Sequence, residues 1–307
     1  MLLRILAIAH NTFREAARDR VPLGLFGAGL AVGTTSLLVA AMSLGRDRAE
    51  VVAVLTTAAV SLFSLIGAIV LGATLLYKDL ERKTIFPILA RPVRRWELVV
   101  GKHLGLVATV STFALLMGAL SLTLTAFQRD VGAGRALGGW LLVGVIAAGV
   151  LVRARDASTP FLLLAPLLFL IEASAVGPLG ELRHLIVVSV ALAVVESALV
   201  AAVSMVFGAF STPFLTAVMT IGVVLIGRNA DLLARLPEKT FGYAFVLFGR
   251  ALARVVPNLQ LYVPPRVVLT GHAGGSGYLA EAFAYGALYV VVLLLVSALI
   301  FRQRDFA

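Results

Sequence analysis

Few residues of this 307-residue sequence have the types and spacing needed for chemistry on a bound substrate. Its single Gly-Lys pair, Gly101–Lys102, is the nearest approach to a phosphate-binding loop, in which backbone amides and a lysine converge on phosphates. That loop also needs a glycine five positions before the second glycine and a Ser or Thr after the lysine. Trp96 and His103 stand there instead. The sequence therefore predicts no nucleotide site.

Other catalytic signatures are missing as well. Neither HExxH nor GxSxG occurs, so no zinc-protease or hydrolase motif is present. The chain has no cysteine, and its four histidines are scattered, which predicts no metal centre and no thiolate nucleophile. We therefore expect a chain that is not itself an enzyme and that holds no cofactor of its own.

Glu196 is the exception, because it is an ionisable residue in the middle of a long apolar run. Such a carboxylate costs about 2.5–3.5 kcal/mol on insertion scales, so it should face the helix bundle or a wet cavity. One hypothesis makes it a translocation or gating residue. The other makes it bundle glue, hydrogen-bonded to a neighbour such as Ser189 or Ser197. Glu172 lies nearer the end of its apolar segment, where solvation should be easier.

Composition indicates the environment of these residues. The chain is 60% hydrophobic and 14% charged, with a mean hydropathy of +1.01. Soluble domains average roughly 45–50% apolar and about 25% charged, so an ordinary soluble enzyme is excluded. The formal charge of +10 is carried by bases that flank apolar runs, which is typical of a membrane protein and not of a nucleic-acid binder.

Eight apolar segments approach the length of about 20 residues that a membrane helix needs. They are Pro22–Leu44, Val51–Tyr77, Leu98–Phe127, Leu137–Val152, Pro160–Val176, Leu185–Phe210, Pro213–Gly227 and Ala282–Phe301. The fourth and fifth are weaker, and the fourth could be a tilted helix or half of a re-entrant hairpin. We predict an all-α polytopic membrane protein with six core transmembrane helices and two extra ones, eight in total.

The distribution of Lys and Arg predicts the orientation. With the N-terminus inside, the short inner segments carry many more of them than the short outer loops. Both termini are therefore expected in the cytoplasm, with the chain in the inner membrane. Residues 1–21 read as an amphipathic helix lying in the headgroup plane, with Leu3, Leu6 and Phe13 on one face. A solvated N-terminal extension is the alternative.

Residues 77–102 form a cytoplasmic elbow rich in both charge signs. Thr84 is a suitable N-cap, and Arg91 precedes a proline, so a short helix should lie between them. Its apolar face needs a partner, either membrane or protein. A basic loop that binds anionic lipid explains the same residues equally well.

Residues 228–280 form the longest stretch between predicted spans. Within it, Phe241–Val256 is apolar and aromatic but carries Arg250 and Arg254 one helical turn apart. It is too short to span the membrane, so an interfacial or re-entrant helix is expected, followed by a flexible Gly/Ser-rich loop.

Several of these runs, in order along the chain, resemble the permeases of the ABC-2 transporter family, including those of nitrous-oxide-reductase maturation. The similar runs are Asn11-Thr12-Phe13-Arg14-Glu15, Glu81-Arg82-Lys83-Thr84-Ile85, Ala90-Arg91-Pro92-Val93-Arg94-Arg95-Trp96-Glu97, Gly101-Lys102, Phe207-Gly208-Ala209-Phe210-Ser211-Thr212-Pro213, Val256-Pro257-Asn258-Leu259 and Phe301-Arg302-Gln303-Arg304-Asp305-Phe306. The chain departs from the family at residues 129–180, where it inserts two extra apolar segments.

The resemblance implies a permease subunit of an ATP-driven exporter, working as two permease copies with two cytoplasmic ATPase subunits that bind ATP and Mg²⁺. The elbow would then be a coupling helix that docks on the ATPase. The residues expected to couple are Glu81, Thr84, Ile85, Phe86, Arg91 and Arg94. The outer loop, with Pro257 and Asn258, would cap an outward gate and meet a periplasmic partner, although a simple lid in the outer leaflet fits equally well. The rival function is a membrane anchor or scaffold that recruits a partner without transporting.

Overall fold

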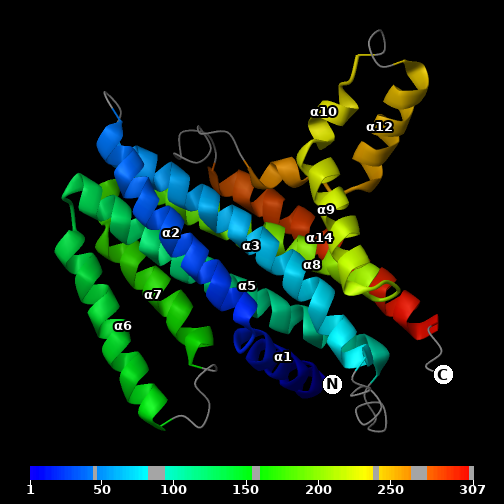
Figure 1. The fold of residues 1–307 in the computed structure, drawn as a ribbon, viewed down its shortest axis with the longest axis horizontal. Helices are drawn as coiled ribbons and strands as arrows, with labels where there is room; N and C mark the ends of the chain where they lie inside the picture. The colour runs from blue at the N-terminus through cyan, green and yellow to red at the C-terminus, as the bar shows by residue number, and fades with distance from the viewer. Residues whose placement is uncertain (44–46, 82–93, 154–159, 238–241, 264–274, 304–307) are drawn as a thin grey trace.

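The computed structural model describes residues 1–43, 47–81, 94–153, 160–237, 242–263 and 275–303. These residues form a bundle of long helices without strands (Figure 1). The predicted all-α class is therefore confirmed for the part of the chain that is described. The helices run in alternating directions through the bundle, and their exposed side chains are largely apolar, as expected of a membrane-embedded surface.

Among the described residues, six helices are long and apolar enough to cross a membrane, which supports a multi-pass membrane protein. They are α2 (Arg20–Met42), α3 (Arg48–Glu81), α5 (Arg95–Arg129), α6 (Ala133–Arg153), α8 (Glu181–Gly208) and α14 (Gly275–Gln303). Of these, α3 and α5 have 34 and 35 residues. At about 1.5 Å per residue, each is about 50 Å long and exceeds the bilayer core of about 30 Å.

The lengths of two helices differ from those of the spans predicted for them. The weak segment Leu137–Val152 belongs to the 21-residue α6, because the helix continues back to Ala133. The segment Pro213–Gly227 instead forms the 16-residue α9 (Pro213–Arg228), which is shorter than a full span. Helix α7 (Phe161–Ala175) is also short, with 15 residues. After α9 the chain continues into the one-turn α10 (Ala230–Ala234).

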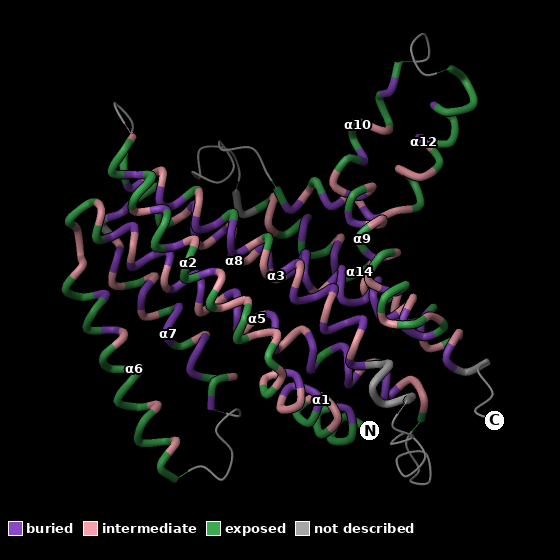
Figure 2. The backbone as a smooth tube through the Cα atoms, viewed as in Figure 1, coloured by how far each residue is buried: buried purple, intermediate pink, exposed green. Residues whose placement is uncertain are grey.

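Helix α8 lies in the centre of the bundle and packs against α3, α5 and α14. Much of its length is buried, whereas α6 at the edge is largely exposed (Figure 2). A short 3₁₀ turn, η1 (Gly177–Leu179), leads into α8. The core around α8 is built mainly from leucine, valine and alanine side chains of α3, α5 and α8, and α1, α9, η2 and α14 also contribute residues to it.

Small residues at four-residue spacing pack helices within the chain. A Cβ atom at Gly105 would collide with the backbone of α1 (Leu2–Ala17), and one at Gly101 would collide with Ile8 of that helix. Gly29 of α2 lies against Met117 of α5, and Gly72 of α3 lies against Ser204 of α8. These glycine faces therefore allow close approach between helices of the same chain.

Helix α1 forms as predicted, but its faces divide differently. Phe13, expected on the lipid side, is buried against the bundle together with Ile5 and Ala16. Leu3 and Leu6 are exposed, as a membrane-facing stripe would be. The helix ends at Ala17, and Asp19 caps α2 by accepting a 3.4 Å hydrogen bond from the Val21 amide. The location of α1 in the headgroup plane stays a prediction.

The first turn of α1 and the last turns of α14 lie at the same end of the bundle, where α3 ends and α5 begins (Figure 1). The Arg95 Nη1 atom of α5 donates a 3.0 Å hydrogen bond to the Phe301 carbonyl of α14, which ties these two helix ends together. The elbow therefore joins two helices at the end of the molecule that also carries α1. Which side of a membrane this end faces stays a prediction.

Candidate intramembrane site

The mid-span carboxylate Glu196 of α8 forms a bidentate ion pair with Arg228, the last residue of α9. Arg228 Nε donates to Glu196 Oε1 at 3.0 Å, and Nη2 lies 2.8 Å from Oε1 and 2.9 Å from Oε2. Glu196 is 1% exposed, whereas the Arg228 side chain is 31% exposed. A guanidinium fork of this kind suits a carboxylate in both charge and geometry. The pair neutralises an otherwise costly buried charge.

Ser61 of α3 completes the cluster. Its Oγ donates to Glu196 Oε2 at 3.3 Å and accepts from Arg228 Nη2 at 3.1 Å. The hydroxyl therefore uses both its donor and its acceptor capacity on the ion pair. Three helices, α3, α8 and α9, meet at this polar centre, which we call the charge cluster (Ser61, Glu196 and Arg228).

The short length of α9 positions Arg228. Glu196 lies 12 residues before the end of α8. Helix α9 begins soon after that end and runs back along α8 in the opposite direction. Arg228, at the last position of α9, then reaches the level of Glu196. Gly227 has no side chain, and a Cβ atom there would collide with the Pro257 carbonyl and with Leu259. The glycine thus lets Pro257 and Leu259 pack directly beside Arg228.

Asn258 anchors the segment that follows α12 (Tyr243–Val255). Its amide nitrogen Nδ2 donates to Asp231 Oδ1 of α10 at 3.0 Å, and its backbone N–H donates to the Tyr285 hydroxyl of α14 at 2.7 Å. Its Oδ1 accepts from the Gln260 amide at 3.0 Å and so caps η2 (Leu259–Tyr262). One side chain and its backbone therefore connect α10, η2 and α14.

Burial is deep where η2 meets α14. Tyr262 is buried, and its hydroxyl donates to the Ala282 carbonyl at 3.2 Å. Burial also raises the pKa of Tyr262 above its ordinary value near 10, so the hydroxyl keeps the proton that it donates.

The predicted outer residues Pro257 and Asn258 lie next to the charge cluster, because Pro257 packs against Gly227 beside Arg228. The predicted helix within this segment also forms, as α12 (Tyr243–Val255), and packs against α10 through Gly249.

The sequence predicted only part of this site. Glu196 does bond a serine, but the serine is Ser61 of another helix, not Ser189 or Ser197. The Ser197 hydroxyl bonds the Val194 carbonyl of its own helix. Arg228 was missed because it was assigned to the outer loop. The available signal was an arginine that directly ends an apolar segment, in a chain with an unpartnered mid-span carboxylate.

The expectation of easier solvation at Glu172 is wrong. Its side chain is fully buried at the contact of α7 with α5. Thr123 donates to Glu172 Oε2 at 3.0 Å, and Trp140 Nε1 of α6 donates to the Thr123 hydroxyl at 2.9 Å. The other carboxyl oxygen, Oε1, has no hydrogen-bond partner among the described residues. The inward face of α7, not the distance to its end, sets the solvation.

The predicted coupling residues lie mostly outside the described part of the chain. Thr84, Ile85, Phe86 and Arg91 are not described, and Glu81 ends α3. Arg94 is the N-cap residue of α5, and its backbone N–H donates to Glu97 Oε2 at 3.1 Å. Lys102 is buried and its Nζ donates to the Leu75 carbonyl of α3 at 3.1 Å. The described ends of the elbow are therefore fixed to each other.

The charge cluster offers a paired cation and anion but no obvious nucleophile or metal cage. Among the described residues, no group of three or more potential metal-ligating side chains occurs. Comparison with models of known protein families and with curated proteins gave no match for this chain.

Proposed function

We propose that the chain is the permease subunit of an ATP-driven transporter of the ABC-2 type, acting in export. A separate cytoplasmic ATPase would supply the energy through the elbow at residues 77–102. Two permease copies and two ATPases would form the complete transporter in the inner membrane. The proposal is supported by the sequence resemblance and by the multi-pass helical fold.

One structural observation carries the mechanical part of this proposal. Helix α3 is continuous from Glu81, at the elbow, to Ser61 in the charge cluster. Twenty residues separate these positions, which corresponds to about 30 Å along a helix. In the proposed mechanism, this continuous helix carries a displacement from the elbow to the charge cluster. Motion imposed on the elbow would therefore act on the contact between Ser61 and the Glu196–Arg228 pair.

A second feature links the two helices that flank the elbow. The Lys102 Nζ of α5 bonds the Leu75 carbonyl of α3 inside the bundle, and the two helices pack closely. The hydrogen bond from Arg95 to Phe301 adds α14 to the same end. A force on the elbow would thus be shared by helices that surround α8. In the proposed mechanism, their shift repositions α9 and the Asn258 segment and opens a path toward the outer face.

The test is coexpression of the full chain with a candidate ATPase encoded beside it, followed by co-purification and measurement of ATP turnover. We expect Phe86→Asp and Arg94→Glu to abolish co-purification. The matched control is Arg153→Glu at the end of α6, an exposed arginine outside the elbow, which should leave binding unchanged. Equal binding by all three variants would overturn the docking site.

Glu196→Gln separates transport from anchoring. In a transporter, this substitution should lower substrate-stimulated ATP turnover while the ATPase still co-purifies. An anchor or scaffold would retain both binding and turnover. ATP hydrolysis by the purified chain alone would contradict the proposal altogether.

A further inference from the structure

A cavity lies apart from the charge cluster, where α1 turns into α2. It has a volume of about 400 Å³ and opens between α1, α2, α5 and the start of α7. This volume is within the range of about 300–1,000 Å³ typical of small-molecule sites. Its wall is almost entirely apolar, and four phenylalanines contribute to it: Phe13, Phe26, Phe113 and Phe161.

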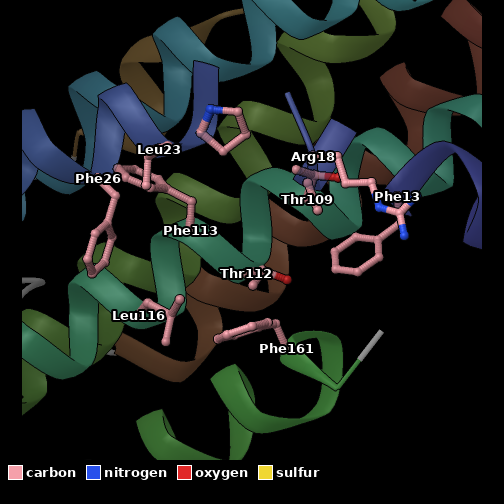
Figure 3. Close-up of a pocket in the computed structure, with 11 residues that line it drawn as sticks. Phe13, Arg18, Leu23, Phe26, Thr109, Thr112, Phe113, Leu116 and Phe161 are labelled. Atoms are coloured by element: carbon pink, nitrogen blue, oxygen red, sulfur yellow. The ribbon is translucent and has the colours of Figure 1, made fainter. Parts of the chain in front are cut away.

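The cavity has a charged end and an apolar end. Figure 3 shows Arg18 and Phe13 at one end of the lining, with Phe26 and Leu116 at the other. Thr109 and Thr112 also line it, but their hydroxyls donate to the Gly105 and Ala108 carbonyls of their own helix. The threonines therefore add little polarity, and the charge is confined to the Arg18 end.

The position of Arg18 in the chain matches the level of lipid headgroups. It lies two residues before α2, a 23-residue helix that would span about 34 Å in a bilayer. The first residue of such a span is at the membrane interface. Around it, Arg14, Arg18 and Arg20 outnumber Glu15 and Asp19, so the junction of α1 and α2 is net positive. A positive, exposed group at this depth favours an anionic headgroup.

We propose that this cavity binds one acyl chain of an anionic glycerophospholipid, with the lipid phosphate against Arg18. The chain enters along the apolar wall toward Phe26 and Leu116. The phosphate stays at the interface, where the guanidinium donates charge-assisted hydrogen bonds to it. Lipid held there contacts α1, α2, α5 and α7 at once. The proposal concerns a separate site and does not depend on the transport function.

The experiment is native mass spectrometry of the full chain in detergent, with added phosphatidylglycerol or with phosphatidylcholine of the same acyl chains. We expect one phosphatidylglycerol to be retained at an activation energy that strips phosphatidylcholine. Arg18→Gln should weaken phosphatidylglycerol retention at least about tenfold, because it removes the charge-assisted hydrogen bonds to the phosphate. The matched control Arg20→Gln changes an exposed arginine two residues away that does not line the cavity.

Filling the cavity tests the acyl chain independently of charge. Thr112→Phe places a ring in the cavity and should abolish retention of the lipid. Its matched control is Thr34→Phe on the exposed face of α2, where the native hydroxyl also bonds its own helix. Equal retention of both lipids by the wild type, or unchanged retention in both Arg18→Gln and Thr112→Phe, would mean non-specific annular lipid and overturn the proposal.

Discussion

Glu196 and Glu172 are two carboxyl groups buried in the same bundle, and they differ in whether a cation lies beside them. Glu196 has a guanidinium from a neighbouring helix within 2.8 Å. Glu172 has the Thr123 hydroxyl and no cation among its described partners. The first group is stabilised as an ion, since its charge is matched. The second should be the neutral acid, because an unpaired buried carboxylate is very costly in an apolar medium.

The difference follows from the helices that meet at each residue. Glu196 lies at the level where the short α9 ends, so the arginine that ends α9 can reach it. Glu172 lies on α7 between two full-length helices, α5 and α6, whose facing side chains are Thr123 and Trp140. Arg228 can pair with Glu196 because α9 ends beside it, whereas the described hydrogen-bond partner of Glu172 is the neutral Thr123. The two sites therefore differ in what they join: the Glu196 site links α3, α8 and α9 by an ion pair, and the Glu172 site links α5, α6 and α7 by neutral hydrogen bonds.

The largest expected effect comes from removing the cation. Arg228→Met leaves Glu196 buried and unpaired, and breaking a buried pair costs about 3–5 kcal/mol. We expect the lower end, about 3 kcal/mol, because the Arg228 side chain is 31% exposed. The double variant Arg228→Met with Glu196→Leu should recover most of this loss. Denaturant unfolding in detergent measures both, and a double variant no more stable than the single one would contradict the ion-pair account.

Replacing each carboxyl by its neutral amide tests the contrast itself. Glu196→Gln removes the charge matched to Arg228, and we expect a loss of about 2 kcal/mol, within the range for hydrogen bonds to charged groups. Glu172→Gln exchanges one neutral group for another that can still accept from Thr123, so the loss should stay below about 1 kcal/mol. The same unfolding assay applies. Equal losses would contradict the proposed contrast between the two carboxyl groups.

A smaller effect should follow from the indole at the second site. Trp140→Phe removes the hydrogen bond from Nε1 to the Thr123 hydroxyl, which should cost about 1 kcal/mol. Trp96→Phe is the matched control, since Trp96 lies in the first turn of α5, far along the helix from Thr123. Thermal unfolding of the two variants compares them directly. If only Trp96→Phe lowers the melting temperature, Trp140 does not stabilise the Glu172 site.

The sequence predicted the helices better than it predicted their contacts. Long apolar runs require helices in a membrane, so α2, α3, α5, α8 and α14 appear where the hydropathy places them. Hydropathy does not set where a helix begins. Helix α6 therefore begins before its apolar run, and α9 is shorter than a full span. The partner of Glu196 is 32 residues away in sequence, and only the length of α9 brings Arg228 to its level. Periodicity cannot provide that information, nor could it show that α7 turns Glu172 inward.

The exposed ion pair between Asp47 and Arg129 should contribute the least stability of the groups compared. It joins the start of α3 to the end of α5 at 2.5 Å, but both side chains are about 40% exposed. The hydrogen bond from Arg129 lowers the pKa of Asp47 below its ordinary value of 3.8. A lowered folded pKa gives stability that is present above the unfolded value and is lost as the pH falls below about 4. Exposed pairs contribute about 0–1 kcal/mol, so Asp47→Asn should cost less than about 1 kcal/mol near neutral pH.

The pH dependence gives a second measurement. Compared with the wild type, the Asp47→Asn variant should lose less stability between pH 5 and pH 3. A loss at neutral pH as large as that of Arg228→Met would mean that burial does not decide the strength of these pairs.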